Sequence, residues 1–176
     1  MAVKLLEIRI STFSKKLCGK FRPEHFHSVV DVIDRFIKII NPKNIYLGEK
    51  DMQQLKIVEH FVKENYSKTK VVGCKTIREK NGTALSSRNF LLNKQELKDV
   101  EKISKTFLNL KNKIKNSRNI NSFLQKSKKD LEKFFNIKIE YLENRNTKNL
   151  TISNKYQGSK VFLSYYYKNI RLIDNF

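Results

Sequence analysis

Hydrophobic residues in the first half of the chain fall into helical periods separated by short apolar runs. Apolar positions recur at three- and four-residue steps before Pro42, which predicts an amphipathic helix with one face made of Val29, Val32, Ile33, Phe36, Ile37 and Ile40. Residues 45–47 indicate a strand closed by Gly48. Residues 55–66 again have helical spacing, and residues 71–73 indicate the next strand. This order, with short connections, is typical of an α/β fold in which helices cover a parallel sheet.

The second half of the chain has a different pattern. Apolar residues from Leu97 to Ile114 predict one long amphipathic helix, and Asn93 with Glu96 forms a plausible capping pair at its start. A second helix is expected to turn five residues inward: Phe123, Leu124, Ser127, Leu131 and Phe134. Three strands are then expected at 137–142, 161–167 and 170–173, with a polar turn at 143–149. The last two are joined too tightly for a helical crossover, which predicts antiparallel pairing in an α+β unit.

Composition and charge narrow the class of protein. The 176 residues are 39% hydrophobic and 31% charged, enough for a core in one domain or two small ones. No apolar run has the length of a membrane span and no signal-peptide core is present, so we expect a cytoplasmic protein. Cys18 and Cys74 lack metal-ligand spacing, which favours two free thiols.

The formal net charge of +20 would ordinarily suggest nucleic acid as a partner. The lysines, however, are spread along the chain among Asn and Ile and form no basic arm. Tyr165, Tyr166 and Tyr167 follow an apolar run, so a half-buried strand explains them better than a base-stacking platform. The pattern therefore disfavours nucleic acid.

Two loops carry the candidate chemistry, Gly48–Gln54 and Leu85–Asn89. Ligands of open parallel sheets bind beyond the carboxyl ends of the strands, where we expect both loops to begin. Gly48 would let the backbone approach a ligand closely, and Lys50 adds a mobile positive charge. Asp51 can cap the following helix, whose first amides suit a phosphate.

The second loop adds further groups that suit a phosphate. Ser86 and Ser87 offer hydroxyl and amide donors, and the planar fork of Arg88 can hold phosphate oxygens bidentately. Each residue alone has an ordinary structural explanation, such as a surface charge, a turn, a helix cap or, for Gln53 and Gln54, an exposed helix position. Their convergence at one sheet edge predicts a phosphate or nucleotide site and specifies no substrate.

At these residues the chain resembles the pantoate-beta-alanine ligases, the pantothenate synthetase family. The resemblance rests on Leu17-Cys18-Gly19, Arg22-Pro23, His25-Phe26, Asn41-Pro42, residues 48–54, Val72-Gly73, Thr76, Arg78-Glu79, residues 84–89 and residues 171–175. Residues 93–160 agree only in pattern. The resemblance implies a partial Rossmann-like, nucleotidyltransferase-type domain over 1–88 and an α+β lid domain over 89–176.

The same resemblance implies an activity and a set of site residues. The reaction would join pantoate to beta-alanine through a pantoyl-adenylate, splitting ATP to AMP and pyrophosphate, with Mg²⁺ accompanying the ATP. The implied ATP contacts are Gly48, Glu49, Lys50, Asp51, Ile77, Leu85, Ser86, Ser87 and Arg88, among which Lys50, Ser86, Ser87 and Arg88 act in catalysis. The implied pantoate contacts are Gln54 and an apolar wall of Val29, Val32 and Ile33. The resemblance also makes a homodimer possible and leaves the metal ligands unknown.

Departures from the family pattern qualify this expectation. The family's His-x-Gly-His loop would lie before Met1, and none of the three histidines, His25, His27 and His60, stands in that setting. Four further positions differ from the residues usual in the family: Glu24 and Ser28 replace small residues, Asp31 replaces threonine, and Lys75 replaces proline. We therefore expect these 176 residues alone to be nearly inactive and to expose a sheet edge or an apolar helix face. The alternative is a shortened, non-catalytic protein of the same fold that binds a nucleotide or a partner.

Overall fold

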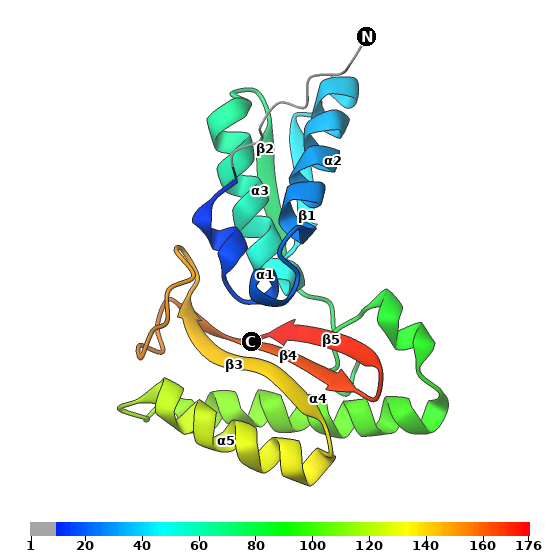
Figure 1. Cartoon of the computed structure of the whole chain (residues 1–176), viewed down its shortest axis with the longest axis vertical. Coiled ribbons are helices and arrows are strands. Elements are labelled where there is room, and N and C mark those ends of the chain that lie inside the picture. Colours follow the sequence, from blue (N-terminus) through cyan, green and yellow to red (C-terminus); the bar gives the residue numbers. More distant parts are fainter. Residues whose placement is uncertain (1–9) are drawn as a thin grey trace. The chain divides into compact units, whose positions relative to one another are not determined.

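The computed structural model describes residues 10–176, which belong to two compact units, Met1–Lys75 and Thr76–Phe176 (Figure 1). The domain boundary expected from the family resemblance falls after residue 88. By their contacts, residues 76–88 group with the second unit. The two candidate loops thus belong to different units, and each is described within its own.

The first unit has the predicted order of helices and strands. Its elements are η1 (Thr12–Lys15), α1 (Cys18–Phe21), α2 (His25–Ile40), β1 (Asn44–Gly48), η2 (Glu49–Asp51), α3 (Met52–Asn65) and β2 (Lys70–Cys74). Strands β1 and β2 pair in parallel, from Asn44 opposite Lys70 to Gly48 opposite Cys74. The α/β character and the parallel pairing inferred from the sequence are confirmed.

Helix α2 buries a stripe that coincides only in part with the one predicted, since Ile37 belongs to both. Phe26, Val30 and Ile37 are buried, whereas the predicted face leaves Val32 46% exposed and Phe36 54% exposed. The helix is apolar on more than one side, and its period alone does not say which side meets α3. The unit consequently exposes several large apolar side chains: Val32, Phe36, Ile39 and Ile40 on α2, Tyr46 on β1 and Val72 on β2. An exposed apolar helix face was among our expectations.

A polar link joins α2 to the end of α3. The Asp34 carboxylate accepts hydrogen bonds from the Lys38 ammonium, at 2.6 Å, and from the Tyr66 hydroxyl. Burial acts to raise the pKa of Asp34, but these two hydrogen bonds outweigh it and hold that pKa below its usual value. Burial, and then the hydrogen bond to Asp34, raises the pKa of Tyr66 to about 12. This link therefore requires an ionised Asp34 and a neutral Tyr66.

The second unit is an α+β unit, as predicted. Its elements are η3 (Ser87–Leu91), α4 (Lys94–Ile114), α5 (Ile120–Phe135), β3 (Lys138–Asn146), β4 (Ser159–Tyr167) and β5 (Ile170–Asn175). The sheet has the order β3-β4-β5 with both pairs antiparallel, and α4 and α5 pack on one of its faces (Figure 1). The predicted capping box is present, with Asn93 and Glu96 each accepting from the other's backbone amide.

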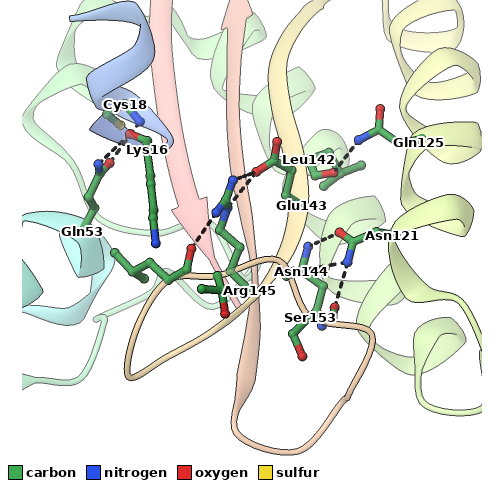
Figure 2. Close-up of polar contacts among 12 residues, drawn as sticks. Lys16, Cys18, Gln53, Asn121, Gln125, Leu142, Glu143, Asn144, Arg145 and Ser153 are labelled. Carbon is green, nitrogen blue, oxygen red and sulfur yellow. Dashed lines mark hydrogen bonds and ion pairs between the residues drawn. The ribbon is translucent and has the colours of Figure 1, made fainter. Parts of the chain in front are cut away.

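Two details of this unit differ from the sequence analysis. Phe134, expected to point inward from α5, is 80% exposed. The expected turn at 143–149 is wrong at its start, because β3 continues to Asn146. Asn144 and Arg145 are buried there. Asn144 donates to the Ser153 and Lys155 carbonyls. Arg145 pairs with Glu143 at 2.6 Å (Figure 2). Tertiary hydrogen bonds thus let an Asn-rich segment remain a strand.

The expectations for the two cysteines and for the tyrosine-rich strand can be compared with the structure. Neither Cys18 nor Cys74 forms a disulfide. Tyr165 is buried, which raises the pKa of its hydroxyl, and it packs against Phe107 as a core residue of the predicted strand. Within residues 10–176, no helix combines the length and apolar character that crossing a membrane requires.

Candidate functional site

The first candidate loop joins β1 directly to α3. Strand β1 ends at Gly48, a single 3-10 turn covers Glu49–Asp51, and α3 begins at Met52. The loop therefore lies at the carboxyl end of a parallel strand and leads directly into a helix start, as predicted. Such an end favours a negatively charged ligand because the helix dipole and unpaired amides both point toward it.

Gly48 leaves space beside the backbone. Its φ of −69° is accessible to any residue, so the loop conformation does not require glycine. A Cβ built at this position would meet nothing within 4 Å. The absence of a side chain opens the strand end, in keeping with the predicted close approach of a ligand.

Asp51 does not act as the predicted helix cap. It occupies the N-cap position of α3 with φ −95° and ψ 50°, and its side chain makes no capping hydrogen bond. A capping side chain normally needs an extended backbone at that residue, and the preceding 3-10 turn prevents it. Asp51 is therefore an exposed residue whose carboxylate is not used as a cap.

The two glutamines that follow have different environments. Gln53, expected on the surface, is only 5% exposed, and its carboxamide bonds to the backbone of residues 13–18 (Figure 2). Gln54 is half-buried, and within residues 10–176 its carboxamide has no hydrogen-bond partner. Gln54 is thus the glutamine with hydrogen-bonding capacity to offer a substrate. No signal in the sequence separates the two residues.

The three proposed pantoate contacts on α2 share one side of that helix. Val29 and Ile33 are half-buried, and Val32 is exposed. They therefore contribute apolar surface that the fold of the first unit does not use completely. Their role as a wall for pantoate stays a prediction.

In the second unit, a short hairpin brings Ile77 and Leu85 together. Arg78 pairs with Ala84 in an antiparallel bridge, and the Leu85 amide donates to the Ile77 carbonyl at 3.0 Å. Gly82 provides the turn with φ +92°, a left-handed conformation that favours glycine. Ile77 is 70% exposed and Leu85 45% exposed. Two residues implied in ATP binding thus form an exposed apolar pair.

Arg78 fixes this hairpin to the last strand. Its guanidinium donates to both carboxylate oxygens of Asp174, at 2.6 and 2.8 Å, and to the carbonyls of Gly82 and Asn175. A planar fork on a carboxylate is the strongest geometry for such a pair. This contact connects two motifs that the sequence analysis noted separately, Arg78-Glu79 and the terminal residues 171–175.

The serines and arginine of the second loop have structural partners. The Ser86 hydroxyl accepts from the Arg88 amide at 3.3 Å, the cap arrangement considered as its ordinary explanation. Ser87 is exposed at the start of η3. The Arg88 guanidinium donates to the Arg171 carbonyl on β5 at 2.5 Å. Ligand binding by Arg88 would therefore share or replace this backbone contact.

The described residues do not build a metal cage by themselves. Across residues 10–176, no group of three or more His, Cys, Asp or Glu side chains is placed to hold a metal ion. Glu49 and Asp51 are the first and last residues of the η2 turn. Mg²⁺ is commonly held by one or two carboxylates together with substrate phosphates, which these residues fit.

Comparisons with known proteins agree with the resemblance noted in the sequence. Residues 2–176 match the family described as Pantoate-beta-alanine ligase. The pantothenate synthetase of Clostridium botulinum (strain Langeland) is 38% identical over 174 residues, covering 96% of this chain and 61% of that protein. The enzyme of Ruminiclostridium cellulolyticum is 34% identical over 171 residues, with the same coverage.

Solved structures give the same result. The pantothenate synthetase of Thermus thermophilus aligns with a TM-score of 0.81 and 26% identity, covering 94% of this chain and 60% of that one. The pantoate-beta-alanine ligase of Francisella tularensis, complexed with beta-gamma ATP and beta-alanine, aligns with a TM-score of 0.76 and 30% identity, covering 99% and 59%. The chain spans about three-fifths of the length of the curated relatives it matches. Over that span, it belongs to the pantoate-beta-alanine ligase family.

Proposed function

We propose that this chain supplies the nucleotide and pantoate contacts of an ATP-dependent ligase that joins pantoate to beta-alanine. The observation that carries the proposal is the β1–α3 junction of a family member, with open space beside Gly48 and no capping side chain over the start of α3. The Francisella tularensis relative, whose structure contains beta-gamma ATP and beta-alanine, supports these substrates.

The proposed chemistry needs charge stabilisation and positioning. The pantoate carboxylate attacks the α-phosphate of ATP, a P–O bond forms, and pyrophosphate leaves. The cations of Lys50 and Arg88 stabilise the negative charge that builds on the phosphate oxygens in the transition state. The beta-alanine amine then attacks the acyl carbon, loses a proton and expels AMP. Neither step needs a protein nucleophile, so orientation of the reactants contributes much of the rate.

Each proposed contact is assigned to a residue within one unit. In the first unit, Gly48, Glu49, Lys50 and Asp51 would contact ATP, and Gln54 would hydrogen-bond pantoate beside the apolar wall on α2. In the second unit, the exposed pair Ile77 and Leu85 would lie against the nucleotide, and Ser86, Ser87 and Arg88 would contact its phosphates. Mg²⁺ would be held by the ATP phosphates with a carboxylate of Glu49 or Asp51, adding positive charge at the phosphates.

A second candidate is a non-catalytic protein that binds a nucleotide or a partner. The exposed apolar side chains of α2, β1 and β2 favour it, because apolar surface of this kind often marks an interaction site. Pyrophosphate release separates the two candidates. Release from ATP that depends on pantoate supports the ligase, whereas nucleotide binding without such release supports the alternative.

The direct test uses the purified 176-residue chain and its Lys50→Ala variant. We expect ATP to bind, Lys50→Ala to weaken that binding, and adenylate formation to be much slower than in the intact Clostridium botulinum relative. Calorimetry measures the binding, and single-turnover analysis with pantoate measures the adenylate. Failure of the folded chain to bind ATP would refute the nucleotide assignment. The cytoplasmic location and a homodimer stay predictions.

A further inference from the structure

Gln53 makes an unusual set of contacts for a residue at the start of a helix. Its Nε2 donates to the carbonyls of Phe13, at 2.7 Å, and Lys16, at 2.6 Å. Its Oε1 accepts from the Cys18 amide at 3.0 Å. Both amide protons are therefore used, and the partners lie 35 to 40 residues away in the sequence. Figure 2 shows this side chain reaching the backbone around Lys16 and Cys18.

The segment that Gln53 holds is tightly wound. Leu17 has φ +43°, a left-handed conformation that a bulky residue rarely adopts, and its side chain is buried. A Cβ on Gly19, in α1, would lie 1.5 Å from the Ser14 carbonyl oxygen in η1, so the close approach of these two elements tolerates only glycine there. A strained turn persists only when its surroundings hold it in place, and the Gln53 contacts do so.

This segment also connects to the start of α2. The Phe26 ring, in the first turn of α2, lies 3.5 Å from the Cβ position of Gly19. Gln53 therefore joins the start of α3 to the start of α2 through residues 13–19. These two helices carry the groups proposed for pantoate, with Gln54 in the first turn of α3 and Val29, Val32 and Ile33 between the start and the middle of α2.

We propose that Gln53 is a positioning residue that sets α2 relative to the β1–α3 junction and thereby shapes the pantoate site. The adjacent glutamines would then have different roles. Gln53 hydrogen-bonds to the backbone of residues 13–18, and Gln54 hydrogen-bonds to the substrate. The substrate side of this inference rests on the proposed function. The inward contacts stand on the hydrogen bonds of Gln53 alone.

Only a carboxamide satisfies this set of partners. Glutamate has nearly the same shape, but at neutral pH its carboxylate accepts only and would face two carbonyl oxygens. Methionine fills the space without donors, which leaves buried backbone groups without their partner. Both Gln53→Glu and Gln53→Met should release residues 13–19 while preserving the bulk of the side chain.

Thiol labelling measures this release directly. Cys18 is 8% exposed and its amide is one of the three partners, whereas Cys74 is exposed. In a Cys74→Ser background, Cys18 is the single thiol and reacts with an aromatic disulfide reagent only when its segment opens. We expect Gln53→Met and Gln53→Glu to speed Cys18 labelling about tenfold or more, since more than one buried hydrogen bond is lost.

Gln54→Met is the matched control, one residue further along the same helix. It should leave Cys18 as protected as in the unsubstituted chain. Slow labelling in folded Gln53→Met would overturn the inference. If that variant does not fold, hydrogen exchange in the natural chain decides: the Cys18 amide should exchange as slowly as the core amides of α3, and exchange at the rate of an open loop would overturn it.

Pantoate binding, measured by calorimetry with a non-hydrolysable ATP analogue, tests the positioning role. Gln54→Met should weaken it with Cys18 still protected, and Gln53→Met should weaken it about tenfold with Cys18 exposed. Unchanged pantoate affinity in folded Gln53→Met would overturn the positioning role. If even the unsubstituted chain binds no pantoate, the proposed function fails, while Cys18 labelling still decides whether Gln53 holds residues 13–19.

Discussion

At the residue scale, the first loop separates groups that serve the fold from groups that face open space. Gln53 is committed to the backbone, whereas Gly48, Asp51 and Gln54 leave space or hydrogen-bonding capacity. Residues of one short motif therefore have distinct tasks, and single substitutions can distinguish them.

Gly48→Ala should leave the fold intact and weaken nucleotide binding. The backbone φ suits alanine and the added methyl meets no atom within 4 Å, so the melting temperature should not fall. A ligand that approaches the backbone would clash with that methyl and bind about tenfold more weakly. Circular dichroism and ATP titration measure the two effects. Gly19→Ala is the contrasting control, because its methyl would overlap a backbone oxygen and destabilise the chain. Unchanged ATP affinity in Gly48→Ala would exclude close approach at this strand end.

Lys50→Ala and Arg88→Ala should slow adenylation in the intact ligase by about 10²-fold, because each removes a cation that stabilises transition-state charge. Arg88→Lys should restore only part of the rate, since a lysine lacks the planar fork. Gln54→Ala should instead mainly weaken pantoate binding. Single-turnover adenylate formation at varied pantoate separates rate from affinity. An unchanged rate in Lys50→Ala would remove Lys50 from the mechanism.

At the element scale, polar links fix particular helices and strands. Asp34 and Tyr66 join α2 to the end of α3 in the first unit, and Arg78 and Asp174 join the 77–85 hairpin to β5 in the second. Each link connects segments distant in sequence. Its loss should therefore loosen one pair of elements within its own unit.

Asp174→Ala should destabilise the second unit by about 1–3 kcal/mol, because it leaves the half-buried Arg78 guanidinium without its carboxylate. Urea unfolding followed by far-UV circular dichroism measures the change. Asp130→Ala, which removes an exposed carboxylate on α5, is the control and should change the free energy of unfolding by less than about 0.5 kcal/mol. Equal effects of the two substitutions would show that the pair contributes no net stability.

The Asp34–Tyr66 link predicts opposite pH dependences for its two groups. The folded-state pKa of Tyr66 is raised to about 12, so its contribution is complete below the unfolded value near 10 and is lost as pH rises toward 12. The pKa of Asp34 is lowered, so its contribution is present above about pH 4 and is lost on acidification. Tyr66→Phe keeps the ring and should reduce the alkaline loss of stability, measured by urea unfolding at about pH 9 and about pH 11.5, on either side of the unfolded value. An equal alkaline loss in both chains would contradict this assignment.

At the scale of the whole molecule, the exposed apolar side chains of the first unit predict association. Phe36 and Ile39 lie on α2 outside the proposed pantoate wall and are exposed. We expect the chain to self-associate at micromolar concentration and Phe36→Lys with Ile39→Lys to reduce this association. Sedimentation velocity measures it. Phe134→Lys, at an exposed apolar position on α5, is the control and should have little effect. A monomeric natural chain at high concentration would refute the prediction.

The sequence by itself determined the local elements and the family. Helical periods, apolar runs and the capping pair Asn93 and Glu96 depend on neighbouring residues, and the structure confirmed them. The motif Gly48–Gln54 likewise identified a strand-to-helix junction and, with its companions, the ligase family. These features can be predicted from the sequence alone because the interactions that produce them act over a few neighbouring residues.

Only the tertiary structure decided which side chains face inward. The buried stripe of α2, the burial of Gln53, the partner of Arg78 and the extension of β3 through Asn144 depend on segments 9 to 97 residues away. Periodicity gives the direction in which a side chain leaves its own helix or strand. It does not identify which other segment, if any, packs against that side. Two adjacent glutamines are equivalent in the sequence, and they differ here because the backbone of residues 13–18 lies beside only one of them.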